Sequence, residues 1–231
     1  MPNFKVQFHC HTKQDPEDYI AHSEIALIDR AAKQKIDVLS ITCHNVIIFN
    51  EDLKKYAAKK RIKLLPGIEK SIEKKHVLIL NAAVDAQRIE TFDDLKKYKN
   101  NHPESLIIAA HPFYPGPTCI RKKLDKNIDL FDALEYSWFH TKRRNKYNKK
   151  AALKAEEYGK PLIGTSDNHI LRYLNETYSI VESKSNNTKH IIDAIKNNKI
   201  KIISHDLSFA QLLLAGMETF IRGMIKKFTP Q

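Results

Sequence analysis

The chain has 231 residues, a formal net charge of +12 and 42% hydrophobic residues. These values are typical of one globular domain and exclude a disordered chain. No apolar run approaches the roughly 18 residues of a membrane span, so no membrane partner is expected. The three cysteines are widely spaced and predict no disulfide framework, which favours a cytoplasmic location. The positive charge favours an anionic partner, although most of it lies in lysine runs typical of solvated surface.

Apolar, strand-like runs alternate with helical segments along most of the chain. The predicted strands are 4–9, 37–42, 62–69, 76–82, 106–111, 133–137 and 161–167, and the predicted helices are 23–35, 51–61, 91–101 and 141–159. Thr91 followed by Asp93 and Asp94 indicates a helix start. Because strands and helices alternate, we expect an α/β fold with a parallel sheet buried on both sides. Seven strands in this order favour a closed or nearly closed (β/α) barrel over residues 1–205.

The segment 206–231 differs from the region before it. From Phe209 to Phe228 its apolar residues follow helical spacing, and Arg222, Lys226 and Lys227 lie off the apolar stripe. We expect an amphipathic C-terminal helix that packs on the barrel or forms an oligomer interface. The basic residues are too few to support attachment to a membrane surface.

Histidines and carboxylates fall at the ends of the predicted strands. His9 and His11 lie two residues apart after the first strand, and Asp167 and His169 repeat that spacing after the last. Residues two apart in a strand share a face, so both side chains can reach one ion. The other strands contribute His44, Glu69, His76 and His111. Barrel enzymes place their active sites at the carboxyl ends of the strands, so we expect these side chains to converge.

The residue types constrain the kind of metal site. A structural zinc site would be closed by paired cysteine thiolates, which this chain lacks. A mixed set of imidazoles and carboxylates suits manganese, zinc or iron, and a carboxylate such as Glu69 can bridge two ions. Such ions activate water and polarise a phosphoryl oxygen, which indicates hydrolysis.

In order along the chain, these residues lie in the motifs FHCHT, ITCHN, PGIE, HVLIL, AAHP, LEYS and TSDNH. In this set and order the chain resembles the polymerase and histidinol phosphatase (PHP) family from about Phe4 to Asn198. The resemblance implies a distorted seven-stranded (β/α) barrel with up to three metal ions. Its members include phosphatases, exoribonucleases and the exonuclease domains of bacterial replicative polymerases.

The resemblance also implies how two to three divalent ions would be held. The first ion would take His9, His11, Glu69 and Asp167. The second would share Glu69 and add His76 and His111. The third would use His44, His169 and an aspartate shortly after the first motif, where Asp15 is nearest in position and Asp18 is the alternative.

Two motifs depart from the family pattern. Cys43 stands where the family usually has an aspartate, and we interpret it as a packing or supporting residue, with a thiolate ligand as the alternative. Ser137 stands where asparagine is common. Glu135, in the same motif, is expected to support the site rather than bind an ion.

The expected reaction is hydrolysis of a phosphate ester by water that the ions activate, with Asp167, His169 and Glu69 at the catalytic centre. His140 is a candidate proton donor to the leaving group, with a solvated loop histidine as the alternative. Arg143, Arg144 and Arg172 are candidates to bind the phosphate through bidentate hydrogen bonds, with surface arginines as the alternative.

The substrate is left open among several classes. A phosphomonoester of a small metabolite or nucleotide is favoured over an oligonucleotide cut by a 5′–3′ exonuclease, which would make short single-stranded nucleic acid the partner. No stacking motif for nucleic acid is recognisable. A non-catalytic RNA-binding barrel of PHP type is a third interpretation. A redox or amidohydrolase activity on a related metal barrel is a fourth, but no bridging lysine is evident.

Overall fold

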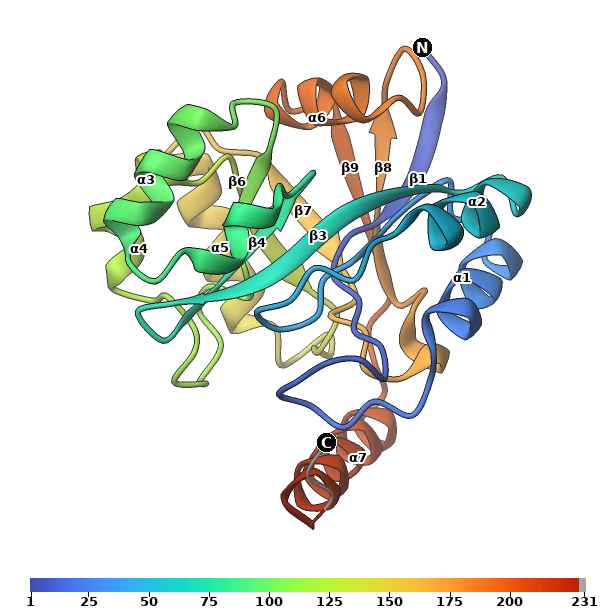
Figure 1. Ribbon diagram of the computed structural model, residues 1–231. Helices are drawn as coiled ribbons and strands as arrows, with labels where there is room; N and C mark the ends of the chain where they lie inside the picture. Colours follow the sequence, from blue (N-terminus) through green and yellow to red (C-terminus); the bar gives the residue numbers. More distant parts are fainter. Residues whose placement is uncertain (229–231) are drawn as a thin grey trace.

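The computed structural model describes residues 1–228, which form an α/β barrel with one long C-terminal helix (Figure 1). Seven strands follow one another in chain order around the sheet, and two more extend it beyond β1. The strands are β1 (Asn3–Gln7), β2 (Val38–Ile41), β3 (Lys63–Ile72), β4 (Lys75–Leu80), β5 (Leu106–Ala109), β6 (Ala133–Ser137), β7 (Leu162–Thr165), β8 (Thr177–Glu182) and β9 (Ile200–Ser204). The predicted α/β class and nearly closed barrel are therefore confirmed.

The sheet is mixed, so the expectation of an all-parallel sheet was wrong. β4 runs antiparallel to both β3 and β5, and β8 runs antiparallel to β1 and β9. Glu73 and Lys74 join β3 to β4 with φ angles of 46° and 63°. Positive φ at both central residues is typical of the tight turn of a hairpin. β4 therefore begins at the rim where the parallel strands end.

The barrel closes where β7 approaches β8. The Gly164 backbone N–H donates to the Ser179 hydroxyl at 2.8 Å, and that hydroxyl donates back to the Gly164 carbonyl at 3.0 Å. A Cβ at Gly164 would lie only 2.7 Å from Ile202 Cγ2, so this approach requires glycine. Past the strand ends, Asn168 N–H donates to the His9 carbonyl at 2.9 Å, which joins the ends of β7 and β1.

The barrel interior is filled by alternate residues of the strands. Leu78 and Leu80 of β4 and Leu106 and Ile108 of β5 belong to one buried cluster, whereas their chain neighbours pack outward against helices. Ile191, Ile192 and Ile195 of α6 (Thr188–Lys196) join the interior cluster, so α6 covers one end of the barrel (Figure 1). The opposite end is left for the polar residues that follow the strands.

The helices flank the sheet on two sides, with α1 and α2 on one and α3, α4 and α5 on the other (Figure 1). Thr91 begins α3 with a capping box completed by Asp94, as the sequence predicts. The helices are α1 (Glu24–Lys33), α2 (Glu51–Lys59), α3 (Phe92–Asn101), α4 (Lys123–Asn127), α5 (Lys146–Glu157), α6 (Thr188–Lys196) and α7 (Phe209–Phe228), with 3₁₀ turns η1 (Val84–Arg88), η2 (Ile128–Leu130) and η3 (Leu171–Tyr173).

The long helix α7 lies at the end of the molecule opposite α6 (Figure 1). Leu212 and Ala215 pack against Trp138 and Tyr173, and Ala215 is 1% exposed. Most large apolar residues of α7 are instead exposed to solvent. The last residues of the segment predicted as 206–231, residues 229–231, lie outside the described residues. Over residues 1–228, no helix combines the length and hydropathy needed to cross a membrane.

Candidate metal centre

The histidines and carboxylates predicted for the site meet at the end of the barrel opposite α6. Loops after β1, β2, β5 and β7 carry most of them, and Glu69 lies within β3. His76 is the second residue of β4. Because β4 runs antiparallel to β3, its first residues lie at the same rim as the ends of the parallel strands. The residues that converge are His9, His11, His44, Glu69, His76, His111, Asp167 and His169.

Glu69 lies at the middle of this group and is 1% exposed. Its two oxygens face different histidines. Oε2 lies 3.1 Å from His9 Nε2, 3.3 Å from His11 Nε2 and 3.1 Å from His44 Nε2. Oε1 lies 2.8 Å from His76 Nδ1 and 3.2 Å from His111 Nε2. A carboxylate whose oxygens face two separate sets of imidazoles has the arrangement of a bridge between two ions.

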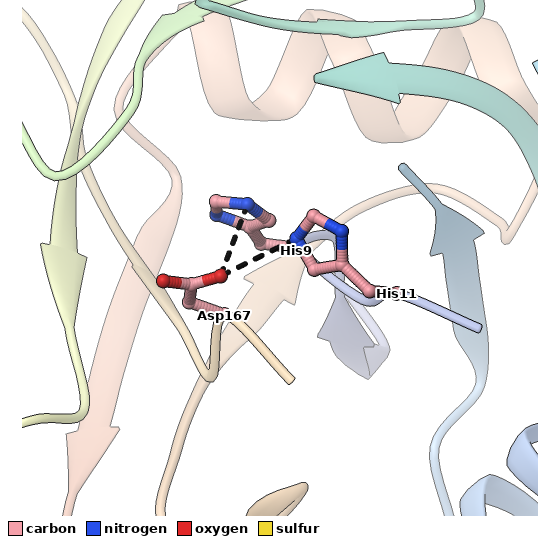
Figure 2. Close-up of side chains that lie close together, drawn as sticks. All are labelled: His9, His11 and Asp167. Atoms are coloured by element: carbon pink, nitrogen blue, oxygen red, sulfur yellow. Dashed lines mark ion pairs between the residues drawn. The ribbon is translucent and has the colours of Figure 1, made fainter. Parts of the chain in front are cut away.

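Asp167 faces two of the three imidazoles that lie near Oε2 of Glu69. Figure 2 shows its Oδ1 directed at both rings, 3.3 Å from His9 Nε2 and 3.4 Å from His11 Nε2. Asp167 and His111 have positive φ angles, 42° and 27°. Such backbone is strained for residues other than glycine and concentrates at functional sites. Both residues follow directly on buried strands, and the strain accompanies their turn toward the centre.

Carboxylates behind the imidazoles hold them in place. His9 Nδ1 donates to Glu135 at 2.7 Å, while His11 Nδ1 and His44 Nδ1 donate to Asp15 at 2.7 Å and 2.9 Å. Their Nε2 atoms are thereby turned toward Glu69. Imidazoles that bind metals usually donate their second nitrogen to such an acceptor, which fixes the tautomer.

Asp15 and Asp18 occupy different places. Asp15 is fully buried, and besides the two imidazoles it accepts the backbone N–H groups of Glu17, Asp18 and His44, each at 2.9 Å. Asp18 lines the cavity in front of the centre, and its Oδ2 lies 3.0 Å from His169 Nε2 and 3.7 Å from His44 Nδ1. Of the two aspartates, Asp18 is therefore the one that faces the cavity.

The packing of acids and imidazoles changes the ionisation of both. Burial alone would lower the pKa of His9, but Glu69, Asp167 and Glu135 outweigh it and raise the pKa to about 9. The same balance raises the pKa of His44 to about 10, through Glu69 and Asp15. Burial opposes ionisation of Glu69, yet the surrounding histidines hold its pKa well below the usual range. The buried carboxylates thus require positive charge close by.

Several buried polar atoms of this group make no hydrogen bond within residues 1–228. They are His9 Nε2, His11 Nε2, both ring nitrogens of His76 and Oδ1 of Asp167. Buried polar atoms are normally hydrogen-bonded, so such a concentration requires an explanation. Five sets of side-chain atoms here lie within 4.8 Å of one another: His9, His11 and Asp167; His11, His44 and Glu69; Glu69, His76 and His111; Asp15, Asp18 and His44; and Glu17, His44 and His76. The residues present therefore fit divalent cations.

A cavity of about 420 Å³ opens directly onto the centre. Its floor contains His111, Asp167 and His169, and its walls include Trp138 and Phe139 from the loop after β6. Residues of α7 also line it: Gly216, Thr219, Arg222 and Gly223. This volume lies within the range of small-molecule sites, about 300–1,000 Å³.

Four other predicted site residues do not line this cavity. His140 is buried. Its Nε2 is hydrogen-bonded to Ser204 Oγ at 2.8 Å, and its Nδ1 lies 3.2 Å from Asp206 Oδ1. Arg144 lies over the Phe209 ring, and Arg143 is exposed. Arg172 is ion-paired with Glu218 of α7. In this structure these side chains connect loops and α7 rather than facing the centre.

Cys43 and Ser137, the two residues that depart from the family pattern, lie in different surroundings. Cys43 is fully buried in the core beneath α1 and α2, and burial raises the pKa of its thiol. Its Sγ lies 3.5 Å from the Thr12 hydroxyl. Ser137 lines the cavity, and Asn148 of α5 accepts its backbone N–H at 3.0 Å.

Two residues near the centre were missed in the sequence. Cys119 Sγ lies 3.3 Å from His111 Nδ1 and so takes the place that a carboxylate takes behind the other imidazoles. Arg222 of α7 lines the cavity mouth. No strand-end pattern points to either residue, although Arg222 lies off the apolar stripe of its helix, which was the available signal.

Comparison with known proteins agrees with this architecture. The sequence profile of the PHP-associated family matches residues 145–200. No curated protein matches the chain significantly. A two-domain protein of Bacteroides vulgatus containing a PHP-like metal-dependent phosphoesterase is similar in structure, with a TM-score of 0.70, 17% identity and coverage of 94% of this chain and 70% of that one.

Two further solved structures share the fold at similarly low identity. PsfC from Pseudomonas syringae has a TM-score of 0.68 and 15% identity, over 97% of this chain and 100% of that one. The lesion-specific endonuclease Q from Pyrococcus furiosus has a TM-score of 0.62 and 17% identity, over 87% of this chain and 58% of that one.

Proposed function

We propose that this chain, a member of the PHP domain family, is a metal-dependent phosphoester hydrolase that acts on a small phosphomonoester. The observation that carries the proposal is the bridging arrangement of Glu69, a buried carboxylate whose two oxygens face five imidazoles. Two solved structures of this fold belong to proteins that are named metal-dependent phosphoesterases, from Bacteroides vulgatus and Bifidobacterium adolescentis.

The geometry supports an assignment of residues to two ions and favours a third. The first would be held by His9, His11, Glu69 and Asp167, and the second by Glu69, His76 and His111. For the third we assign His44 and His169 together with Asp18, because Asp15 is already saturated by donors from His11, His44 and the backbone. Imidazole and carboxylate donors of this kind suit manganese, zinc or iron.

When bound, such ions lower the pKa of water and neutralise charge on phosphoryl oxygens. The residues of the chain supply the positions. Glu69 would help to hold the first two ions, while Glu135 and Asp15 keep the Nε2 atoms of His9, His11 and His44 directed inward. Phosphoryl transfer depends mainly on such positioning and on electrostatic stabilisation.

The cavity favours a small substrate over a polymer. The loop after β6 and residues of α7 line it, and its volume of about 420 Å³ is typical of sites for small molecules. A nuclease is the second candidate, because endonuclease Q shares the fold and the chain carries a net charge of +12. Hydrolysis of labelled single-stranded DNA or RNA at a rate above that of small monoesters would favour the nuclease.

Removal of bound metal is expected to abolish hydrolysis reversibly. Protein purified without chelator should contain two to three equivalents of manganese, zinc or iron by mass spectrometry and should hydrolyse p-nitrophenyl phosphate. Dialysis against EDTA should remove both the metal and the activity, and added Mn²⁺ or Zn²⁺ should restore the activity. A chain that binds neither ion, or whose activity survives complete loss of metal, would contradict the proposal and leave RNA binding as the better hypothesis.

A further inference from the structure

The cavity in front of the centre is built from two unlike walls. One carries aromatic side chains: Tyr114, Trp138 and Phe139, with Tyr19 near the mouth. Trp138 is held rigidly, because its ring stacks on Tyr173 at a centroid distance of 4.5 Å. The other wall is the face of α7 that carries Gly216, Thr219 and Gly223.

The glycines on α7 leave the second wall flat. A Cβ added to Gly216 or to Gly223 would meet nothing within 4 Å, so neither glycine is required by close packing. Glycine in a helix interior is less favourable than alanine, so two glycines along one cavity wall are an unfavourable choice for the helix alone. The space that they leave open is continuous with the space beside Trp138 and Phe139.

Arg222 provides the positive charge at this cavity. Among the described residues that line it, Arg222 is the single lysine or arginine. Its guanidinium donates to the Tyr19 carbonyl at 3.3 Å, and within residues 1–228 no carboxylate lies at ion-pair distance from it. A guanidinium without a carboxylate partner, above a floor of metal-binding side chains, is suited to an anionic oxygen of a phosphate ester.

We propose that α7 and the aromatic wall form a recognition pocket for a phosphomonoester whose leaving group carries a flat aromatic ring. Nucleoside monophosphates and aryl phosphates share this chemistry. The ring lies between Trp138 and the glycine face of α7, and Arg222 binds a phosphate oxygen that the ions do not reach. Stacking of a base on an aromatic side chain contributes substantially to binding and requires no particular base. The proposal rests on the proposed phosphoesterase activity, because the phosphate must reach the centre.

A larger side chain in the ring pocket tests recognition of the substrate ring separately from catalysis. Gly216→Leu is expected to raise KM for adenosine 5′-monophosphate and for p-nitrophenyl phosphate about tenfold or more, while kcat/KM for glycerol 2-phosphate, which has no ring, stays unchanged. Leucine favours helix over glycine, so the variant should fold. Ala210→Leu, on the same helix outside the cavity, is the matched control. A larger loss for one of the two ring substrates identifies the natural class as nucleotide or aryl ester.

Arg222→Met is expected to raise KM about tenfold or more for all three phosphates, since a charged hydrogen bond to phosphate is lost. Lys227→Met removes the same charge from an exposed position on the same helix and should leave KM unchanged. Equal effects of the two variants would overturn the role given to Arg222.

Binding of the ring can also be followed without turnover. Trp138 is the only tryptophan in the chain, so adenosine is expected to quench its fluorescence in the wild type and much less in Gly216→Leu. If the wild type hydrolyses none of the three phosphates, the phosphoesterase proposal fails while this titration still tests the pocket. Unchanged fluorescence with adenosine, or an equal effect of Gly216→Leu on ring and ringless substrates, would overturn the pocket.

The outer face of α7 carries a second, independent feature. Leu213, Met217, Phe220 and Met224 recur four, three and four residues apart, and Met217 and Phe220 are 61% and 69% exposed. This is the spacing of a helix that packs along another helix. The outer face also includes Phe209, Leu214, Ile221 and Phe228, all of them exposed.

We infer that the outer face of α7 pairs with the same face of a second copy of this chain. At about 200 Å² for a large apolar side chain, its exposed part is on the order of 900 Å². That exceeds the patches usual on monomers and matches the roughly 800 Å² that each partner buries in a standard interface. Equivalent faces that meet about a two-fold axis are self-complementary.

Light scattering coupled to size exclusion tests the pairing. The wild type is expected to elute with twice the mass of one chain, and Met217→Glu/Phe220→Glu with the mass of a single chain. The control Gln211→Lys adds a charge at an exposed position of α7 that lies outside this apolar row, and it should remain dimeric. A wild type that is monomeric at tens of micromolar, or that sediments with phospholipid vesicles instead, would overturn the inference.

Discussion

Replacing Glu69 with glutamine is expected to lower phosphomonoester hydrolysis by a factor of about 10³ or more, the scale of removing a principal electrostatic stabiliser. Glutamine has nearly the same size, so the cavity and the strand should be retained. In glutamine, an NH₂ group replaces one of the two carboxylate oxygens, and this group can neither accept a hydrogen bond from an imidazole nor bind a cation. Because each oxygen of Glu69 faces a different set of histidines, one ion loses its bridge whichever way the amide turns.

Metal content by mass spectrometry provides the decisive measurement for this variant, together with activity at saturating Mn²⁺. We expect Glu69→Gln to retain at most one tightly bound ion per chain. Glu73→Gln is the matched control, since Glu73 lies in the turn of the same hairpin and pairs with exposed Lys123. Retention of the full metal content and activity in Glu69→Gln would show that the carboxylate is not a bridge.

The order of the strands and the convergence of the site could both be predicted from the sequence. Continuous apolar runs such as 106–111 identify strands that are buried on both faces, and their alternation with helices implies a barrel. A barrel brings the residues that follow its strands together at one end, so His9, Glu69 and Asp167 could be associated without any knowledge of distance.

Other features depend on contacts that no local pattern carries. The positive φ angles of Glu73 and Lys74 make the β3–β4 hairpin, but neither residue is the glycine or asparagine that usually signals such a turn. β8 was missed because Thr177 and Ser179 point inward, which reverses the expected polar alternation. Its Ser179 hydroxyl is used to join β7, a role that appears only when the barrel closes.

The position of α7 was the least predictable part of the site. Its apolar stripe indicated a face for packing, yet the structure places small and polar residues against the barrel and most of the large apolar ones outside. The docked face is held by specific contacts, among them the Arg172–Glu218 ion pair and the Arg222 hydrogen bond to Tyr19. The spacing of apolar residues in the sequence identifies the stripe, but it does not indicate which face of the helix packs against the barrel.

Asp15→Asn and Asp18→Asn are expected to fail in different ways. Asp15 is fully buried, and its oxygens accept from the imidazoles of His11 and His44 and from three backbone N–H groups. An amide there leaves at least one buried donor facing another donor, which should lower the free energy of unfolding by about 2 kcal/mol. Displacing the imidazoles that it orients should also weaken metal binding about 10–100-fold.

The side chain of Asp18 is 42% exposed. Among the imidazoles, only that of His169 lies within hydrogen-bond distance of it. Asp18→Asn should therefore change the free energy of unfolding by less than about 0.5 kcal/mol, as is usual for surface substitutions. It should nevertheless release one equivalent of metal. Unfolding is measured in EDTA, because bound ions would otherwise add their own binding energy to the native state. If Asp15→Asn instead keeps the wild-type stability and loses a single ion, while Asp18→Asn keeps them all, then Asp15 is the ligand. The expected difference rests on geometry: Asp15 accepts hydrogen bonds from two imidazoles behind the centre, whereas Asp18 faces the cavity.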